Sequence, residues 1–141
     1  MVILETSTQI KTTPLSVWSI LGDANKYPEF FRLASDVSSP GAINSEGTDL
    51  NMVFLGIFLR LKVTKAQSPS NLSMKSYYGM RAQFHWRLEP CDVGTEVHLQ
   101  VNYLTPYSVK GVIVEEEATR TKINGGLQET MSSLKELANS Q

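Results

Sequence analysis

The chain has 141 residues, of which 41% are hydrophobic and 19% are charged, and this is the composition of one globular domain rather than of a disordered segment. Its 13 basic and 14 acidic residues give a net charge of −1. A near-neutral protein has no broad attraction for phosphate backbones, so we expect no nucleic-acid partner.

Cysteine content and hydropathy indicate where the protein resides. Cys91 is the only cysteine, so an internal disulfide cannot form and a reducing compartment is expected. The N-terminus lacks the basic region of a signal peptide. The longest apolar run, residues 53–59, is far shorter than the about twenty residues of a membrane helix. We therefore expect one cytoplasmic domain over residues 1–141.

The first elements are indicated by helix-capping residues. Residues 2–12 alternate as a β-strand does. Thr13 is a good helix N-cap and is followed by a proline, which suits the first helical position. Gly22 ends this short helix, and a second short helix runs to about Phe31.

From residue 36 the apolar residues recur with a period of two. The predicted strands after this point include residues 49–54, 57–64, 72–78, 82–88 and 97–103. Turn residues separate these strands by only a few positions, whereas a parallel crossover needs a dozen residues or more. The strands are therefore expected to form an antiparallel meander.

The C-terminal segment has the periodicity of one long helix. No proline occurs from Ser108 to Ala138, and Val112, Ile123 and Leu127 fall on one apolar stripe. A helix of that length must lie across the whole sheet. The expected fold is α+β: a seven-stranded curved antiparallel sheet, two short helices, and a long C-terminal helix that together enclose a cavity.

The chain resembles polyketide cyclase/dehydrase-like proteins of the START-type (SRPBCC) helix-grip superfamily. The resemblance is carried by residues 10–23 (IKTTPLSVWSILGD) and 27–30 (YPEF), by 84–90 (FHWRLEP) and 94–97 (GTEV), and by the final stretch 126–137. It covers essentially the whole chain in order. These are mostly packing and turn residues, so they are specific for the fold and weak for the function.

The resemblance implies a cavity for a small hydrophobic ligand such as a lipid, quinone, polyketide or isoprenoid, which the protein would bind or carry. The alternative is a polyketide cyclase, aromatase or dehydratase, in which Arg120 would stabilise an enolate and Glu116 or a tyrosine would move the proton. No nucleophile–base pair or cofactor motif occurs in the sequence, so no cofactor is expected and nothing directly indicates catalysis.

Glu116 and Arg120 interrupt the apolar stripe of the C-terminal helix. They are four residues apart and fall on the face that should meet the sheet. A dry core seldom tolerates an ion pair, so the two side chains either line a wet cavity and orient a polar ligand group, or belong to a solvated helix start. The sequence leaves both interpretations open.

The apolar hairpin turn at residues 54–58 is a second unusual feature, because turns are normally polar. By resemblance it is the gate of the cavity, faced by Tyr78-Gly79-Met80 and by the rim residues 105–107. A turn packed against a neighbouring segment or a dimer partner is the alternative. The residues expected to bind the ligand are Phe54, Phe58, Leu59, Leu61, Tyr78, Phe84, Val101, Tyr103, Tyr107, Glu116, Arg120 and Ile123.

The remaining expectations concern metals and partners. His85 and His98 fall on the polar side of their strands, and two histidines without a third ligand make a poor metal site, so no metal is expected. The protein is expected to be a monomer or a weak dimer. A third interpretation is an interaction module in which the 54–58 turn makes a transient membrane or protein contact.

Overall fold

The computed structural model describes residues 1–105, 108–109, 112–113 and 115–140. Its elements, in chain order, are β1 (Val2–Ile10), α1 (Pro14–Leu21), the 3₁₀ turn η1 (Ala24–Lys26), α2 (Tyr27–Phe30), β2 (Ala34–Ser38), β3 (Asp49–Phe54), β4 (Ile57–Gln67), β5 (Asn71–Tyr78), β6 (Ala82–Cys91), β7 (Gly94–Tyr103), β8 (Ser108–Val109), β9 (Val112–Ile113) and α3 (Glu116–Asn139).

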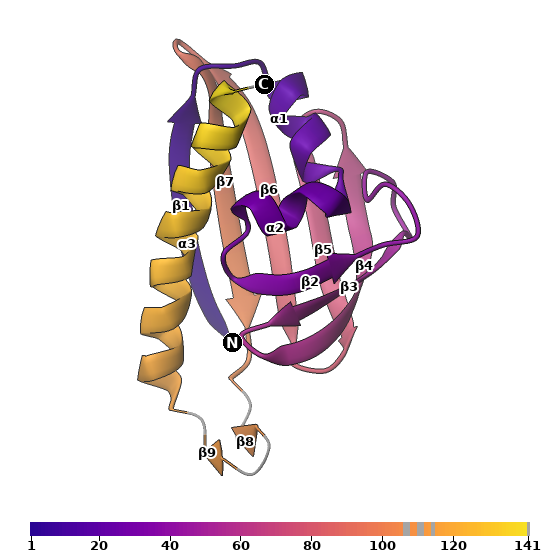
Figure 1. The fold of residues 1–141 in the computed structure, drawn as a ribbon, viewed down its shortest axis with the longest axis vertical. Helices are drawn as coiled ribbons and strands as arrows, with labels where there is room; N and C mark the ends of the chain where they lie inside the picture. Colours follow the sequence, from indigo (N-terminus) through magenta and orange to yellow (C-terminus); the bar gives the residue numbers. More distant parts are fainter. Residues whose placement is uncertain (106–107, 110–111, 114, 141) are drawn as a thin grey trace.

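One curved antiparallel sheet of seven strands, in the order β1-β7-β6-β5-β4-β3-β2, forms the body of the molecule (Figure 1). Strands β2 to β7 form a meander, and β1 pairs with the far side of β7. The β1–β7 register runs without a shift from Val2↔Tyr103 to Ile10↔Thr95. The predicted helix-grip architecture is therefore confirmed.

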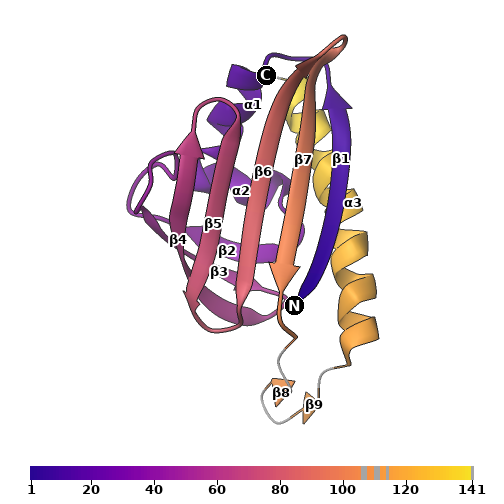
Figure 2. The same cartoon turned by 180° about the vertical axis from the view of Figure 1, so that it is seen from behind.

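All three α-helices cover the same face of this sheet. Helix α3 packs along β1 and against α2, while α1 packs on β6 and β7 (Figure 1). The opposite face is left uncovered, as Figure 2 shows. As predicted, Thr13 caps α1, since its side chain accepts a hydrogen bond from the Ser16 amide, and Pro14 begins the helix.

Aromatic rings fill the interior under α2. The ring centroids of Phe31 and Phe84 are 5.8 Å apart, and those of Phe54 and Phe84 are 5.3 Å apart. Trp86 completes the cluster beside Phe30, at 6.2 Å. Edge-to-face pairs of this kind stabilise a core beyond the burial of their area. This cluster fills the space between α2 and strands β3 and β6.

The start of the C-terminal helix differs from the prediction. Helix α3 begins at Glu116 and not at Ser108, because the short strands β8 and β9 precede it and pair through Ser108↔Ile113 and Val109↔Val112. β-branched residues favour strands over helices, which outweighs the helical spacing of Val112 with the later stripe. Among the described residues, no helix is long and apolar enough to cross a membrane.

Candidate functional site

Six of the predicted ligand-binding residues share the interior beneath the helices. They come from four strands and from α3, and each is at most 1% exposed: Phe54, Leu59, Leu61, Phe84, Val101 and Ile123. Their neighbours in sequence point to the other face, because side chains alternate along a strand. Phe84 and Val101 face one another directly across β6 and β7. The sheet therefore brings these apolar side chains together from distant parts of the chain.

Tyr103 adds a polar group to this apolar interior. It ends β7, is 0% exposed, and its hydroxyl has no hydrogen-bond partner among the described residues. Burial raises the pKa of the Tyr103 phenol; the nearby Arg120 opposes this increase and Glu116 adds to it. The hydroxyl is therefore protonated at neutral pH and is an unused hydrogen-bond donor.

Other buried polar atoms also lack a hydrogen-bond partner within the described part of the chain. They include Oγ1 of Thr105, two residues beyond Tyr103, and Oδ1 of Asn102 on β7. A buried polar group without a partner costs free energy and needs an explanation. A bound ligand with polar groups would supply one.

Glu116 and Arg120 lie in the first turns of α3, near the Tyr103 hydroxyl. Nη2 of Arg120 is 3.3 Å from Oε1 of Glu116. The side chains of Glu116 and Arg120 are 57% and 48% exposed, so the pair is solvated and not enclosed. Such a pair is worth only about 0.3–0.5 kcal/mol. It stands where solvent meets the interior, and both charges act on Tyr103.

Phe58 and Tyr78 lie on the uncovered face of the sheet, away from the six buried residues. They are 43% and 60% exposed. Their ring centroids are 6.1 Å apart, and the Arg60 guanidinium lies 5.8 Å from the first and 5.6 Å from the second. Phe58 alternates with the buried Leu59, and this parity turns it outward.

The turn between β3 and β4 has a conformation that is uncommon for its residue types. Phe54 pairs with Ile57, and the two residues between them, Leu55 and Gly56, have φ angles of 52° and 82°. A left-handed leucine is rare, since its side chain crowds the backbone there. The Leu55 amide donates to the Leu33 carbonyl, so the turn bends toward β2. Tyr107 lies outside the described residues.

A polar hollow of about 700 Å³ lies on the uncovered face, and sequence analysis did not foresee it. It is lined by both histidines, Ser73 and Arg87, among others. Nδ1 of His85 is 2.9 Å from the Ser73 hydroxyl, and Nε2 is 3.3 Å from Oε1 of Gln83. Burial lowers the pKa of His85. Both histidines alternate with apolar residues along their strands, and this was the one signal of the hollow in the sequence. The register of the strands was needed to place the partners of the histidines.

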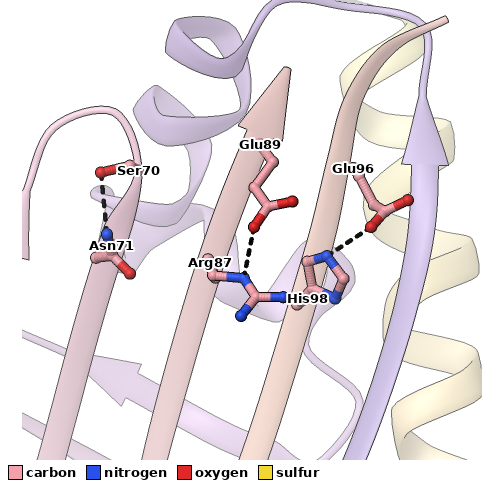
Figure 3. Close-up of polar contacts among 6 residues, drawn as sticks. All are labelled: Ser70, Asn71, Arg87, Glu89, Glu96 and His98. Atoms are coloured by element: carbon pink, nitrogen blue, oxygen red, sulfur yellow. Dashed lines mark hydrogen bonds and ion pairs between the residues drawn. The ribbon is translucent and has the colours of Figure 1, made fainter. Parts of the chain in front are cut away.

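Beside this hollow, β6 and β7 bring two carboxylates and a histidine together (Figure 3). Nε2 of His98 is 2.7 Å from Oε1 of Glu96, and Nε of Arg87 is 3.0 Å from Oε1 of Glu89. The donor atoms of Glu89, Glu96 and His98 lie within 4.8 Å of one another. They could hold a divalent ion only if Glu89 released Arg87, so the present arrangement is an ion-pair network.

Comparison with solved structures confirms the fold. A crystal structure of a Mesorhizobium loti protein, MLL2253, superposes with a TM-score of 0.76 at 15% identity, covering 99% of this chain and 98% of that one. The crystal structure of Ara h 8.0201 has a TM-score of 0.69 at 12% identity, over 99% and 98% of the two chains. The Aha1 dimer from Colwellia psychrerythraea has a TM-score of 0.67 at 18% identity, over 96% and 97%.

Few residues are identical in these alignments, so they show that the chain has a helix-grip fold and do not show its activity. No protein-family model and no curated protein matches the chain.

Proposed function

We propose that this protein binds or carries a small hydrophobic ligand between its sheet and α3. The observation that carries the proposal is the Tyr103 hydroxyl, which is buried at the edge of an apolar interior and has no hydrogen-bond partner in the described part of the chain. Ligand sites are mostly apolar and contain a few polar groups that fix orientation. A lipid, quinone, polyketide or isoprenoid with one carbonyl or hydroxyl has that chemistry.

The proposed pose follows from this distribution of groups. The apolar part of the ligand would lie against Leu61 and Val101, and its polar end would accept a hydrogen bond from Tyr103. Each Å² of apolar surface removed from water contributes roughly 25 cal/mol. Glu116 and Arg120, at the solvent side of Tyr103, would contact any charged or hydroxylated end of the ligand. The turn between Phe54 and Ile57 would form the gate, whereas Tyr78 lies on the uncovered face and would take no part in it.

Titration with an apolar fluorescent probe tests the proposal. We expect stoichiometric binding to the wild type and its loss in Leu61→Trp, because the larger ring occupies the interior. Leu15→Trp is the matched control, since Leu15 is 62% exposed on α1. Circular dichroism tests whether both variants are folded. If Leu61→Trp is unfolded, Val101→Ile replaces it as a smaller substitution that fills the same interior. A folded wild type that binds no probe would contradict the proposal.

A second candidate is catalysis on a ligand in the same place, as a polyketide cyclase, aromatase or dehydratase. The observation in its favour is that Arg120, Glu116 and Tyr103 lie close enough to influence one another. Arg120 would stabilise an enolate while Glu116 or Tyr103 moved the proton. Turnover of a polyketone, lost in both Arg120→Ala and Glu116→Gln, would support this reaction. Probe binding without turnover would leave binding or carriage alone.

A further inference from the structure

Charge is unevenly distributed along this near-neutral chain. The segment from Leu50 to Leu88 holds six of the 13 basic residues and none of the 14 acidic ones. It comprises most of β3, all of β4 and β5, and the first part of β6. One half of the sheet is therefore strongly basic, although the net charge of −1 conceals it.

Exposed aromatic rings gather with these charges on the uncovered face. We define the basic–aromatic surface by Phe58, Arg60, Lys75, Tyr77, Tyr78 and Arg81. Tyr77 and Tyr78 are 57% and 60% exposed, and Arg60 lies over the rings of Phe58 and Tyr78. Nζ of Lys62 lies 5.7 Å from the centroid of the Tyr77 ring. The same Nζ is 3.3 Å from Oδ1 of Asp49, and among the described residues this is the one ion pair at the border of the surface.

A hollow of about 560 Å³ lies within this surface. Lys75, Tyr77, Tyr78 and Arg81 contribute to its walls, together with Ser76 and Gln83. Two cations and several hydroxyl or amide groups around one hollow match the chemistry of a phosphate ester. Among the described residues, no carboxylate lines it.

The surface is located at the end of the molecule where the proposed ligand would enter. The β5–β6 turn is hydrogen-bonded to the end of β7, because the Leu104 amide donates to the Arg81 carbonyl at 3.1 Å. The end of β7, of which Tyr103 is the last residue, and the start of α3 lie at this same end (Figure 2). Met1 and Leu104, 61% and 48% exposed, add apolar side chains there.

We propose that the basic–aromatic surface docks the protein on a membrane that contains anionic phospholipids. Its lysines and arginines would contact headgroup phosphates, and its aromatic rings would lie in the interfacial layer, where tyrosines are enriched in membrane proteins. The exposed Met1 and Leu104 favour a lipid surface over a nucleic acid, which has no apolar layer to receive them. The idea rests on the proposed function, since docking would hold the open end against the source of a hydrophobic ligand.

Vesicle co-sedimentation tests this inference. The wild type is expected to pellet with vesicles of phosphatidylcholine and phosphatidylglycerol, and not with phosphatidylcholine alone. Lys75→Glu/Arg81→Glu is expected to weaken that binding at least about tenfold. Lys11 follows the end of β1 and Lys135 lies near the end of α3, and these element ends are at the other end of the molecule (Figure 1). Lys11→Glu/Lys135→Glu makes the same change of net charge at these exposed sites, and it should bind as the wild type does.

The aromatic contribution is tested separately. Tyr77→Ser/Tyr78→Ser should reduce the vesicle binding that remains at high salt, where charges are screened. Leu15→Ser, a change at an exposed apolar residue on α1, should not. Equal loss in the two charge-reversal variants, equal binding to neutral vesicles, no pelleting of the wild type, or preference for a single-stranded oligonucleotide over vesicles would each overturn the inference.

Probe binding without vesicles, measured on the same variants, separates the two proposals. A charge-reversal variant that binds the probe and fails to bind vesicles supports membrane docking. A wild type that binds anionic vesicles and no probe would contradict the proposed function and leave the docking surface in place.

Discussion

At the scale of single residues, the Tyr103 hydroxyl is the most informative group in the structure. A typical hydrogen bond contributes about 1 kcal/mol net, whereas a buried donor without a partner costs roughly 1–3 kcal/mol. Among the described residues no acceptor meets the Tyr103 hydroxyl at the end of β7, so this donor is available to a ligand. Cost of this kind is typical of binding sites, where the missing partner arrives with the ligand.

Tyr103→Phe tests this interpretation, because it removes the hydroxyl and keeps the ring. Without ligand, we expect the free energy of unfolding to stay the same or to rise by about 1 kcal/mol. Affinity for a probe that carries a carbonyl should fall about fivefold, while affinity for a pure hydrocarbon probe should not change. Thermal melts and fluorescence titrations measure both. Tyr77→Phe, at an exposed tyrosine, is the control. Equal loss for both probes would place the hydroxyl outside the site.

His85 predicts how stability depends on pH. Burial lowers its pKa below the ordinary value of 6.5, so the folded protein holds fewer protons at this side chain than the unfolded chain does in the window below 6.5. The contribution of the neutral imidazole to stability is complete above 6.5 and is lost as the pH falls through that value toward the folded-state pKa. Denaturant melts over this window should show stability falling with pH.

The matched variants assign that slope to His85. His85→Gln should flatten the profile, because it cannot take up a proton. His98→Gln retains His85 and should keep the slope. An unchanged profile in His85→Gln would mean that the imidazole is equally accessible to protons in the folded and unfolded states.

At the scale of elements, the position of α3 is set by close contact with the segment that follows α2. A Cβ atom placed on Gly126 would lie 2.4 Å from Cδ2 of Leu33, which is 2% exposed. The hydroxyl of Thr130, one turn further along α3, accepts a hydrogen bond from the Arg32 amide at 2.9 Å. These contacts hold the helix over the sheet and so determine the width of the interior.

The adjacent glycines of α3 give a matched pair of substitutions. Gly125→Ala meets open space and should stabilise the protein by about 0.5–1 kcal/mol, because alanine is the better helix former. Gly126→Ala should be less stable than Gly125→Ala by about 1–3 kcal/mol, since Leu33 must shift within the core. Chemical denaturation of both variants compares them. Equal stabilisation would show that α3 can move away from Leu33 at no cost.

At the scale of the whole molecule, the apolar interior changes in character along β6 and β7. The aromatic cluster reaches Phe84, which pairs with Val101, and the hydroxyls of Tyr103 and Thr105, which have no hydrogen-bond partner among the described residues, follow at the end of β7. The regularity of strand pairing also differs across the sheet. β6 and β7 pair without interruption from Ala82↔Tyr103 to Cys91↔Gly94, whereas the short edge strand β2 shifts register between Ser35 and Ser38.

The rates of amide hydrogen exchange should follow this difference in strand pairing. Amides of β6 and β7 are expected to exchange slowest, near the rate set by global unfolding, and amides of β2 to exchange much faster through local opening. Saturating probe should slow exchange at the end of β7 and the start of α3 more than in α1. Mass spectrometry of labelled peptides measures both effects. Uniform protection, unaffected by the probe, would contradict a site at the Tyr103 end.

Local patterns in the sequence were sufficient to predict the order of the elements as far as β7 and the face of the sheet on which each strand residue lies. A period of two places Leu59 and Leu61 on one face and Phe58 and Arg60 on the other in any sheet that they join, because alternation is a local property of extended backbone. The cap at Thr13 is equally local. The segment after residue 107 had two competing local patterns, and sequence reasoning chose the wrong one.

The contacts between residues far apart in the chain could not be predicted from such local patterns. The register places His98 opposite Arg87 and Glu96 opposite Glu89, and the start of α3 brings Glu116 and Arg120 toward Tyr103. A shift of one residue in the β6–β7 register would have turned the side chains of one strand to the other face of the sheet. Strand pairing and helix packing join segments far apart in the chain through the burial of whole surfaces, and no local pattern carries that information.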